Sequence, residues 1–245
     1  MPERRYGRSP APAWMRPIAE RLSPAIRNLV VAQAILFFLY IMVAGLRIPI
    51  KLHLALGPLV AAGELWQPAT SLFVHVEWWS FVFDLIGLWF VGATVEQALG
   101  RRRFLVLFLG TGILANVAVA FVMAALRWSG VYTGCGDAVL ALFVALGVIY
   151  GPTQVRVLGP LVLQARVLAA ILVGFSVVSA LAQAAWPSLA GTLVSVCLGY
   201  FLAGGRWGAL SGWLGRLRPK RRRSVLEVLE GGRGRSGRSG KKYVN

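Results

Sequence analysis

The chain has 245 residues, of which 57% are hydrophobic and 14% charged, and its formal net charge is +17. Long apolar stretches without charge exclude an ordinary soluble domain and indicate a polytopic membrane protein. The basic residues gather near the two ends and in short clusters, which favours contact with an anionic membrane surface over nucleic-acid binding.

Six apolar stretches predict six membrane-spanning helices, and residues 1–28 before them are interpreted as a basic cytoplasmic tail without a signal peptide. The predicted spans cover residues 29–46, 78–99, 104–126, 137–150, 167–185 and 188–203. At about 1.5 Å per residue, the first span reaches roughly 27 Å, enough for the core of a bilayer. The fourth span is shorter, so we expect it to be sunk inside the bundle.

Residues 47–77, between the first two spans, mix charges, prolines and apolar residues and therefore predict an interfacial loop. With six spans, all the basic clusters fall on one side of the membrane, so both termini are expected in the cytoplasm. Residues 206–245 are rich in Arg, Lys, Gly and Ser and predict a polybasic tail that is held to anionic lipid. The predicted organisation is two tails around a membrane domain, residues 29–205, in a bacterial inner membrane.

One segment carries a specific series of residues around the second span. In chain order the series is Trp66, Thr70, Phe73-Val74-His75, a Trp-Trp pair, Gly92, Glu96, Gly100, a basic cluster and Phe104-Leu105. This series resembles the corresponding region of the rhomboid family of intramembrane serine proteases. The resemblance extends over about residues 29–205 and implies an all-α, six-helix, rhomboid-like bundle. It also implies structural roles for His75, in the loop before the second span, and for Glu96, which caps a helix.

An active rhomboid uses a serine in a G-x-S-G motif on the fourth span and a histidine on the sixth, with a histidine and an asparagine on the second span stabilising the oxyanion. The residues at these positions are Gly136 for the serine, Ser80 and Asp84 for the oxyanion pair, and Ser188 or Thr192 for the base. No histidine follows His75, so the serine mechanism lacks both its nucleophile and its base.

The sixth predicted span carries small residues four positions apart, which predict close packing against the fourth span. They are Gly191, Ser195 and Gly199.

Two aspartates lie in predicted spans, where a carboxylate at mid-helix costs about 2.5–3.5 kcal/mol. We favour structural roles: Asp137 as a helix N-cap, and Asp84 as a buried hydrogen-bond partner of Ser80, Thr192 or a water molecule. The other interpretation is a carboxylate dyad that activates water. G-x-G-D at 134–137 and Pro187-Ser188-Leu189 resemble motifs of the intramembrane aspartyl proteases, of the presenilin and signal-peptide-peptidase class.

We therefore predict a rhomboid-like pseudoprotease that binds transmembrane clients or partner subunits. Its contact site would be a polar cavity formed by Ser80, Asp84, Cys135, Asp137 and Thr192. Two alternatives stay open: an active intramembrane protease, by an unrecognised serine or an aspartyl mechanism, and a structural subunit of a membrane complex. No cofactor and no metal site are predicted, because His75 shows no metal partner in the sequence. Cys135 is interpreted as a small apolar filler.

Overall fold

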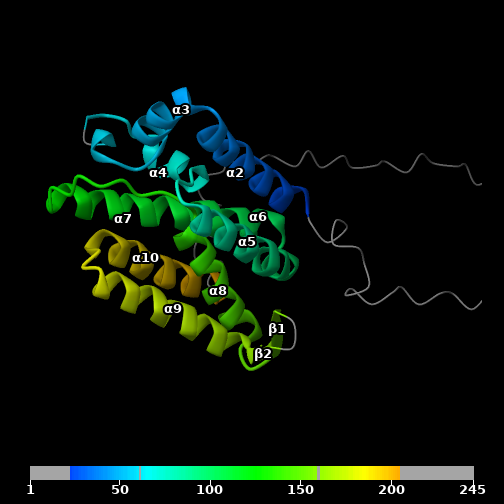
Figure 1. The fold of residues 1–245 in the computed structure, drawn as a ribbon. Coiled ribbons are helices and arrows are strands. Elements are labelled where there is room, and N and C mark those ends of the chain that lie inside the picture. Colours follow the sequence, from blue (N-terminus) through cyan, green and yellow to red (C-terminus); the bar gives the residue numbers. More distant parts are fainter. Residues whose placement is uncertain (1–22, 61, 159–160, 205–245) are drawn as a thin grey trace, which may run out of the picture. The chain divides into compact units, whose positions relative to one another are not determined.

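The computed structural model describes residues 23–60, 62–158 and 161–204 (Figure 1). Both predicted tails and their lipid contacts lie outside these residues, apart from the last residues of the first tail. Five of the described helices are long and apolar enough to cross a membrane: α2 (Pro24–Met42), α5 (Trp78–Leu99), the stretch Arg101–Ala125, α9 (Ala165–Ala182) and α10 (Trp186–Ala203). With the shorter apolar helix α8 (Gly136–Tyr150), they confirm the predicted all-α bundle of six helices.

The first helix, α2, begins five residues earlier than predicted. Ser23 is its N-cap and accepts the backbone N–H of Ile26 (3.3 Å), and Pro24 occupies the first helical position, where its missing N–H costs nothing. The helix ends at Met42 because Val43 adopts an extended conformation. The sequence prediction, based on uncharged length alone, missed the cap and therefore placed the helix start at residue 29.

Between α2 and α5, where the sequence predicted an interfacial loop, the chain forms short, irregular helices. They are α3 (Ala44–Pro49), η2 (Ile50–Leu54), η3 (Pro58–Val60), α4 (Gln67–Thr70) and η4 (Ser71–Phe73). The buried side chain of Gln67 ties them together, because it accepts the N–H of Gly57 and donates to the carbonyl of Leu52. A further backbone bridge joins Leu56 to Tyr132, in the segment just before α8.

The second and third membrane helices are joined by a single residue. The second helix, α5, has the predicted bounds, and Gly100 follows it at φ +79°, a conformation that suits glycine. The chain then continues through α6 (Arg101–Leu105), the π-helical turn η5 (Val106–Gly110) and α7 (Thr111–Ala125). This reversal places the three arginines of α6 at the end of α5.

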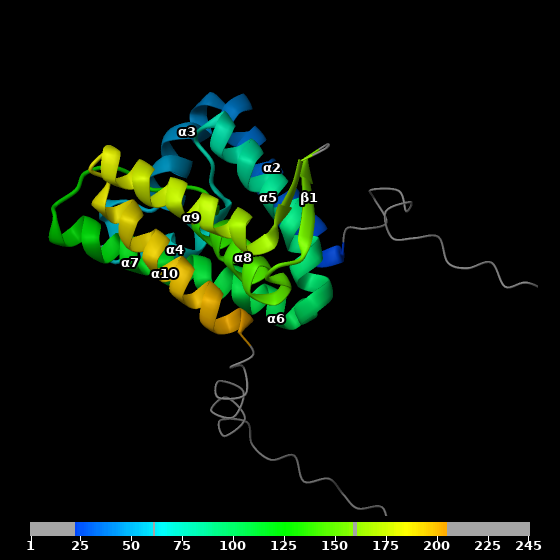
Figure 2. The ribbon, with the colours of Figure 1, turned by 90° about the horizontal axis from the view of Figure 1, so that it is seen from below.

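Helix α8 occupies the centre of the bundle, as its shortness predicted. It packs against α5, α7, α9 and α10, and Ala141, Leu142 and Ala145 are fully buried (Figures 1 and 2). Such burial fits a helix that is apolar on nearly all sides. The elements that carry the candidate site residues are therefore assembled around α8.

A β-hairpin between α8 and α9 was not predicted. Its strands, β1 (Gln154–Leu158) and β2 (Leu161–Gln164), pair antiparallel, with Val155 opposite Leu163 (Figure 2). After the hairpin, α9 and α10 run side by side.

Candidate functional site

Asp84 joins three segments of the chain through one carboxylate oxygen. It is buried in the second turn of α5, and its Oδ2 accepts from His75 Nε2 and from the backbone N–H of Cys135, each at 3.0 Å. The expected role of a buried hydrogen-bond acceptor therefore fits, but among the described side chains neither of the two expected protein partners, Ser80 and Thr192, donates to Asp84. The two observed donors come instead from the loop before α5 and from the start of α8.

Asp137 is not the N-cap of α8, contrary to the sequence prediction. The cap position is Cys135, which makes no side-chain capping bond, and Asp137 lies within the first turn. Its Oδ2 accepts a hydrogen bond from the Tyr132 hydroxyl at 2.9 Å. Desolvation, together with the Asp137 carboxylate, raises the pKa of the Tyr132 phenol well above its ordinary value, so the phenol keeps its proton and acts as the donor.

The two aspartates have separate hydrogen-bond partners. His75 and Cys135 hold Asp84, while Tyr132 holds Asp137. A carboxylate dyad works by sharing one proton directly between two oxygens. The observed partners provide a different donor for each carboxylate, which weighs against a shared proton.

The positions that the resemblance predicts to correspond to the rhomboid catalytic residues lie near these carboxylates or line the same cavity. Gly136 opens α8, and a Cβ atom at this position would lie 3.5 Å from Asp84 Oδ1. Ser80 is half-buried on α5 and faces Gly134, whose φ of +96° permits the close approach of the loop. Ser188 and Thr192 lie one turn apart on α10 and line the same cavity as Asp137.

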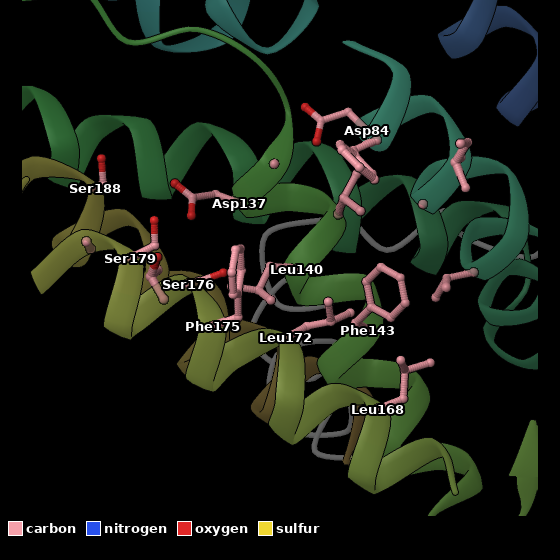
Figure 3. Close-up of a pocket in the computed structure, with 18 of the residues that line it drawn as sticks. Asp84, Asp137, Leu140, Phe143, Leu168, Leu172, Phe175, Ser176, Ser179 and Ser188 are labelled. Atoms are coloured by element: carbon pink, nitrogen blue, oxygen red, sulfur yellow. The ribbon is translucent and has the colours of Figure 1, made fainter. Parts of the chain in front are cut away.

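A cavity of about 850 Å³ extends from the aspartates between α5 and α9 (Figure 3). Both helices pack on α8 but scarcely on each other, which leaves the space open. Its walls are largely apolar, with Leu140, Phe143 and Leu172 near the middle, while Asp84 and Asp137 lie at one end. Cys135 is fully buried and is not among the lining residues, so its thiol is not offered to a molecule in the cavity.

Small residues let α10 approach α8 closely. A Cβ atom on Gly199 would lie 2.8 Å from the backbone oxygen of Ala141, and one on Gly191 would collide with the Asp137 carboxylate. Ser195 is fully buried between these two glycines. This contact fixes the distance between the helix that carries Asp137 and the helix that carries Ser188 and Thr192.

His75 and Glu96 both connect separate segments. His75 is buried in the loop before α5, bonds to Asp84 and packs edge-on against Phe81. Glu96, in the last turns of α5, accepts a hydrogen bond from the Ser23 hydroxyl at the start of α2. Glu96 therefore stabilises the start of α2 through Ser23. The sequence alone did not indicate that α2 would be this helix.

Sequence reasoning missed two residues of this region, Gln33 and Tyr132. Gln33 is fully buried on α2, and its amide nitrogen lies 3.3 Å from Cys135 Sγ. A lone amide in an uncharged span was the signal for Gln33, because polar side chains inside a membrane face protein partners. Tyr132 lay in an apparent loop, and no sequence pattern linked it to Asp137.

Comparison with known proteins supports the arrangement. A family model described as "Rhomboid domain" matches residues 62–205, which is more than half of the chain. The chain is 32% identical over 130 residues to "Rhomboid protease GluP" of Bacillus subtilis, an alignment that covers 50% of this chain and 25% of that protein.

Two further relatives are similarly partial. "Rhomboid-like protease 2" of Toxoplasma gondii is 31% identical over 84 residues, covering 34% of this chain and 29% of that protein. "Rhomboid protease GlpG" of Salmonella choleraesuis is 25% identical over 112 residues, covering 46% of this chain and 39% of that protein. This chain thus spans less than half the length of these relatives. On the family match and the six-helix bundle together, the chain belongs to the rhomboid family.

Proposed function

We propose that this protein is a rhomboid pseudoprotease that binds transmembrane helices in the cavity between α5 and α9. The observation that carries the proposal is the composition of the cavity's polar end. Gly136 stands where the resemblance requires the nucleophile, and the sequence holds no histidine after His75 to act as base. Asp84 also stands where the resemblance places an oxyanion-binding asparagine, and its carboxylate carries no N–H donor.

The cavity has the chemistry of a site for a helix rather than for a water-soluble ligand. Phe83 and Phe90 on α5 and Phe175 on α9 line it and are exposed, so an apolar helix can reach it from the lipid. Ser188 and Thr192 at the polar end provide hydroxyls that can bond to a polar group of a client helix. Interhelical hydrogen bonds and close packing, rather than hydrophobicity, drive helix association in lipid.

Photo-crosslinking from two matched positions tests client binding. Phe175 on α9 is 71% exposed and lines the cavity, whereas Phe121 on α7 is 75% exposed and is not among the lining residues. A photoreactive phenylalanine analogue is placed at each position in cells, and crosslinked membrane proteins are identified by mass spectrometry. We expect discrete partners from position 175 and only diffuse, lipid-like labelling from position 121. Equal labelling from both positions would contradict the proposal.

A protease assay on the same purified protein separates the alternatives. The detergent-solubilised protein is incubated with transmembrane substrates that carry small residues near the membrane surface, and we expect no cleavage. Cleavage that Asp137→Ala abolishes would favour the aspartyl alternative, whose support is that Asp84 and Asp137 line one cavity. Cleavage blocked by serine-directed reagents would favour a serine protease. Stable co-purification of fixed subunits in mild detergent would favour the structural-subunit alternative.

The same proposal places the basic end of the bundle in the cytoplasm, against anionic lipid. Arg27 is at the start of α2, Arg101 follows α5, and a hydrogen bond between Ser23 and Glu96 joins these two ends. Arg166 is the second residue of α9, and its backbone N–H donates to the carbonyl of Gly151, directly after α8. The arrangement supports the positive-inside orientation.

Engineered cysteines in a background without Cys197 test this orientation. A cysteine at Arg166 should resist a membrane-impermeant thiol reagent in intact cells, whereas one at Arg127, between α7 and α8, should react. The opposite labelling pattern would reverse the proposed orientation.

A further inference from the structure

Three chemically different metal ligands meet in the interior of the bundle. They are an imidazole nitrogen of His75, a carboxylate oxygen of Asp84 and the sulfur of Cys135, and these atoms all lie within 4.8 Å of one another. All three residues are buried. The sequence indicated no partner for His75 because Cys135 follows Asp84 by 51 residues, and only the packing of α8 on α5 brings them together.

This combination of donor atoms matches zinc. Thiolate sulfur, imidazole nitrogen and carboxylate oxygen are the ordinary ligands of Zn²⁺, whereas Mg²⁺ and Ca²⁺ prefer oxygen alone. Bonds of about 2.0–2.3 Å in a tetrahedron put the ligand atoms roughly 3.3–3.7 Å apart. His75 Nε2 and Asp84 Oδ2 lie 3.0 Å apart, and all three ligand atoms lie within 4.8 Å of one another, so side-chain movements bring the cluster to this spacing.

Gln33 supplies a fourth polar group at the same place. It is fully buried on α2, its amide nitrogen lies 3.3 Å from Cys135 Sγ, and its carbonyl oxygen has no hydrogen-bond partner in the described part of the chain. A buried carbonyl without a partner destabilises the fold, because it loses its hydrogen bonds to water. A half-turn of the amide exchanges its oxygen and nitrogen, which brings the oxygen beside the sulfur and completes four ligands.

Zinc also balances the charge of the buried cluster. A carboxylate in the protein interior requires a compensating charge or strong hydrogen bonds. With the Asp84 carboxylate, the Cys135 thiolate and two neutral ligands, Zn²⁺ gives a site of zero net charge, and the thiol proton leaves to solvent. His75 Nδ1 has no partner among the described residues, so it is free to carry the ring proton and to leave Nε2 for a metal ion.

We propose that His75, Asp84, Cys135 and Gln33 form a structural zinc site. The site would tie α2, the loop before α5, α5 itself and the start of α8 at one point. The site meets the proposed client cavity only through Asp84, because Gln33, His75 and Cys135 are not among the residues that line the cavity.

Cobalt substitution in the purified full-length protein tests the site. The protein is stripped with a chelator and titrated with CoCl₂, since tetrahedral cobalt bound to a thiolate absorbs in the near ultraviolet and the visible. We expect one cobalt per chain, displaced by ZnCl₂ and not by MgCl₂. Cys135→Ala should abolish the near-ultraviolet band, and the matched control Cys197→Ala, which alters the exposed cysteine, should keep it.

Two outcomes would overturn the proposal: no stoichiometric cobalt in the wild type, or a band that depends on Cys197 instead of Cys135. Zinc-edge X-ray absorption on wild-type protein needs no variant and covers the case in which Cys135→Ala fails to fold. It should show one sulfur at about 2.3 Å and nitrogen or oxygen at about 2.0–2.1 Å. A zinc shell without sulfur would refute the assignment.

Discussion

Gly199→Ala should force α8 and α10 apart and lower the free energy of unfolding. The added Cβ would lie 2.8 Å from the backbone oxygen and 3.1 Å from the Cα of Ala141. Backbone atoms cannot rotate away as a flexible side chain can, so the helices themselves must separate. Overpacking of this kind costs about 1–3 kcal/mol.

Gly174→Ala on α9 is the matched control, because nothing lies within 4 Å of the Cβ it would add. Both substitutions replace a glycine within a helix and share the same gain of about 0.5–1 kcal/mol in helix propensity. The difference between the two variants therefore isolates the overpacking cost. We expect Gly174→Ala to be neutral or more stable than wild type, and Gly199→Ala to be about 1–3 kcal/mol less stable than Gly174→Ala.

Reversible unfolding in mixed detergent micelles, followed by circular dichroism, measures this difference. Equal stability of the two variants would show that α10 does not rest on the backbone of α8 as described. The α8–α10 contact would then not set the geometry of the cavity's polar end.

Ser23→Ala should lower the free energy of unfolding by about 1–2 kcal/mol, because α2 loses its N-cap and Glu96 loses a hydrogen-bond donor. The same unfolding assay measures this loss, and an unchanged free energy would count against the cap. Gly136→Ser should fold normally, since its Cβ meets only ordinary contacts. The new serine should not react with fluorophosphonates, because it has no base to activate it. Labelling would show that a base is present. Tyr132→Phe should be less stable than wild type by about 1 kcal/mol but neutral in an Asp137→Ala background, where the acceptor is gone. A double-mutant cycle measures this difference, and additive effects would place no energy in the hydrogen bond.

The order and positions of the membrane helices could be predicted because lipid imposes a simple rule of length and hydrophobicity. α5 begins and ends where the sequence predicted, and α8 is buried as its shortness implied. The start of α2 was missed because a cap such as Ser23 is a local hydrogen-bond feature that apolar length does not report. The hairpin at 154–164 was missed, although alternating Val and Arg before Gly-Pro is a strand and turn signal.

The positions of the site residues could be predicted, but most of their partners could not. The resemblance placed Asp84 and Gly136 in the same region, and the structure brings them together. The hydrogen bond from Cys135 to Asp84 and that from Tyr132 to Asp137 depend on the path of the loop before α8. That path is set by tertiary packing, such as the backbone bridge between Leu56 and Tyr132, which no short sequence pattern encodes.

The pairing of Asp84 with His75 bears on how the chain enters the membrane during synthesis. Asp84 lies about 9 Å along α5 from the start of that helix, where a lone carboxylate hinders insertion. His75 precedes Asp84 by nine residues and is available when α5 leaves the ribosome, whereas Cys135 is synthesised 51 residues later. His75 is thus a nearby partner for Asp84 when α5 enters the lipid. The backbone N–H of Cys135 adds the second hydrogen bond once α8 has been made.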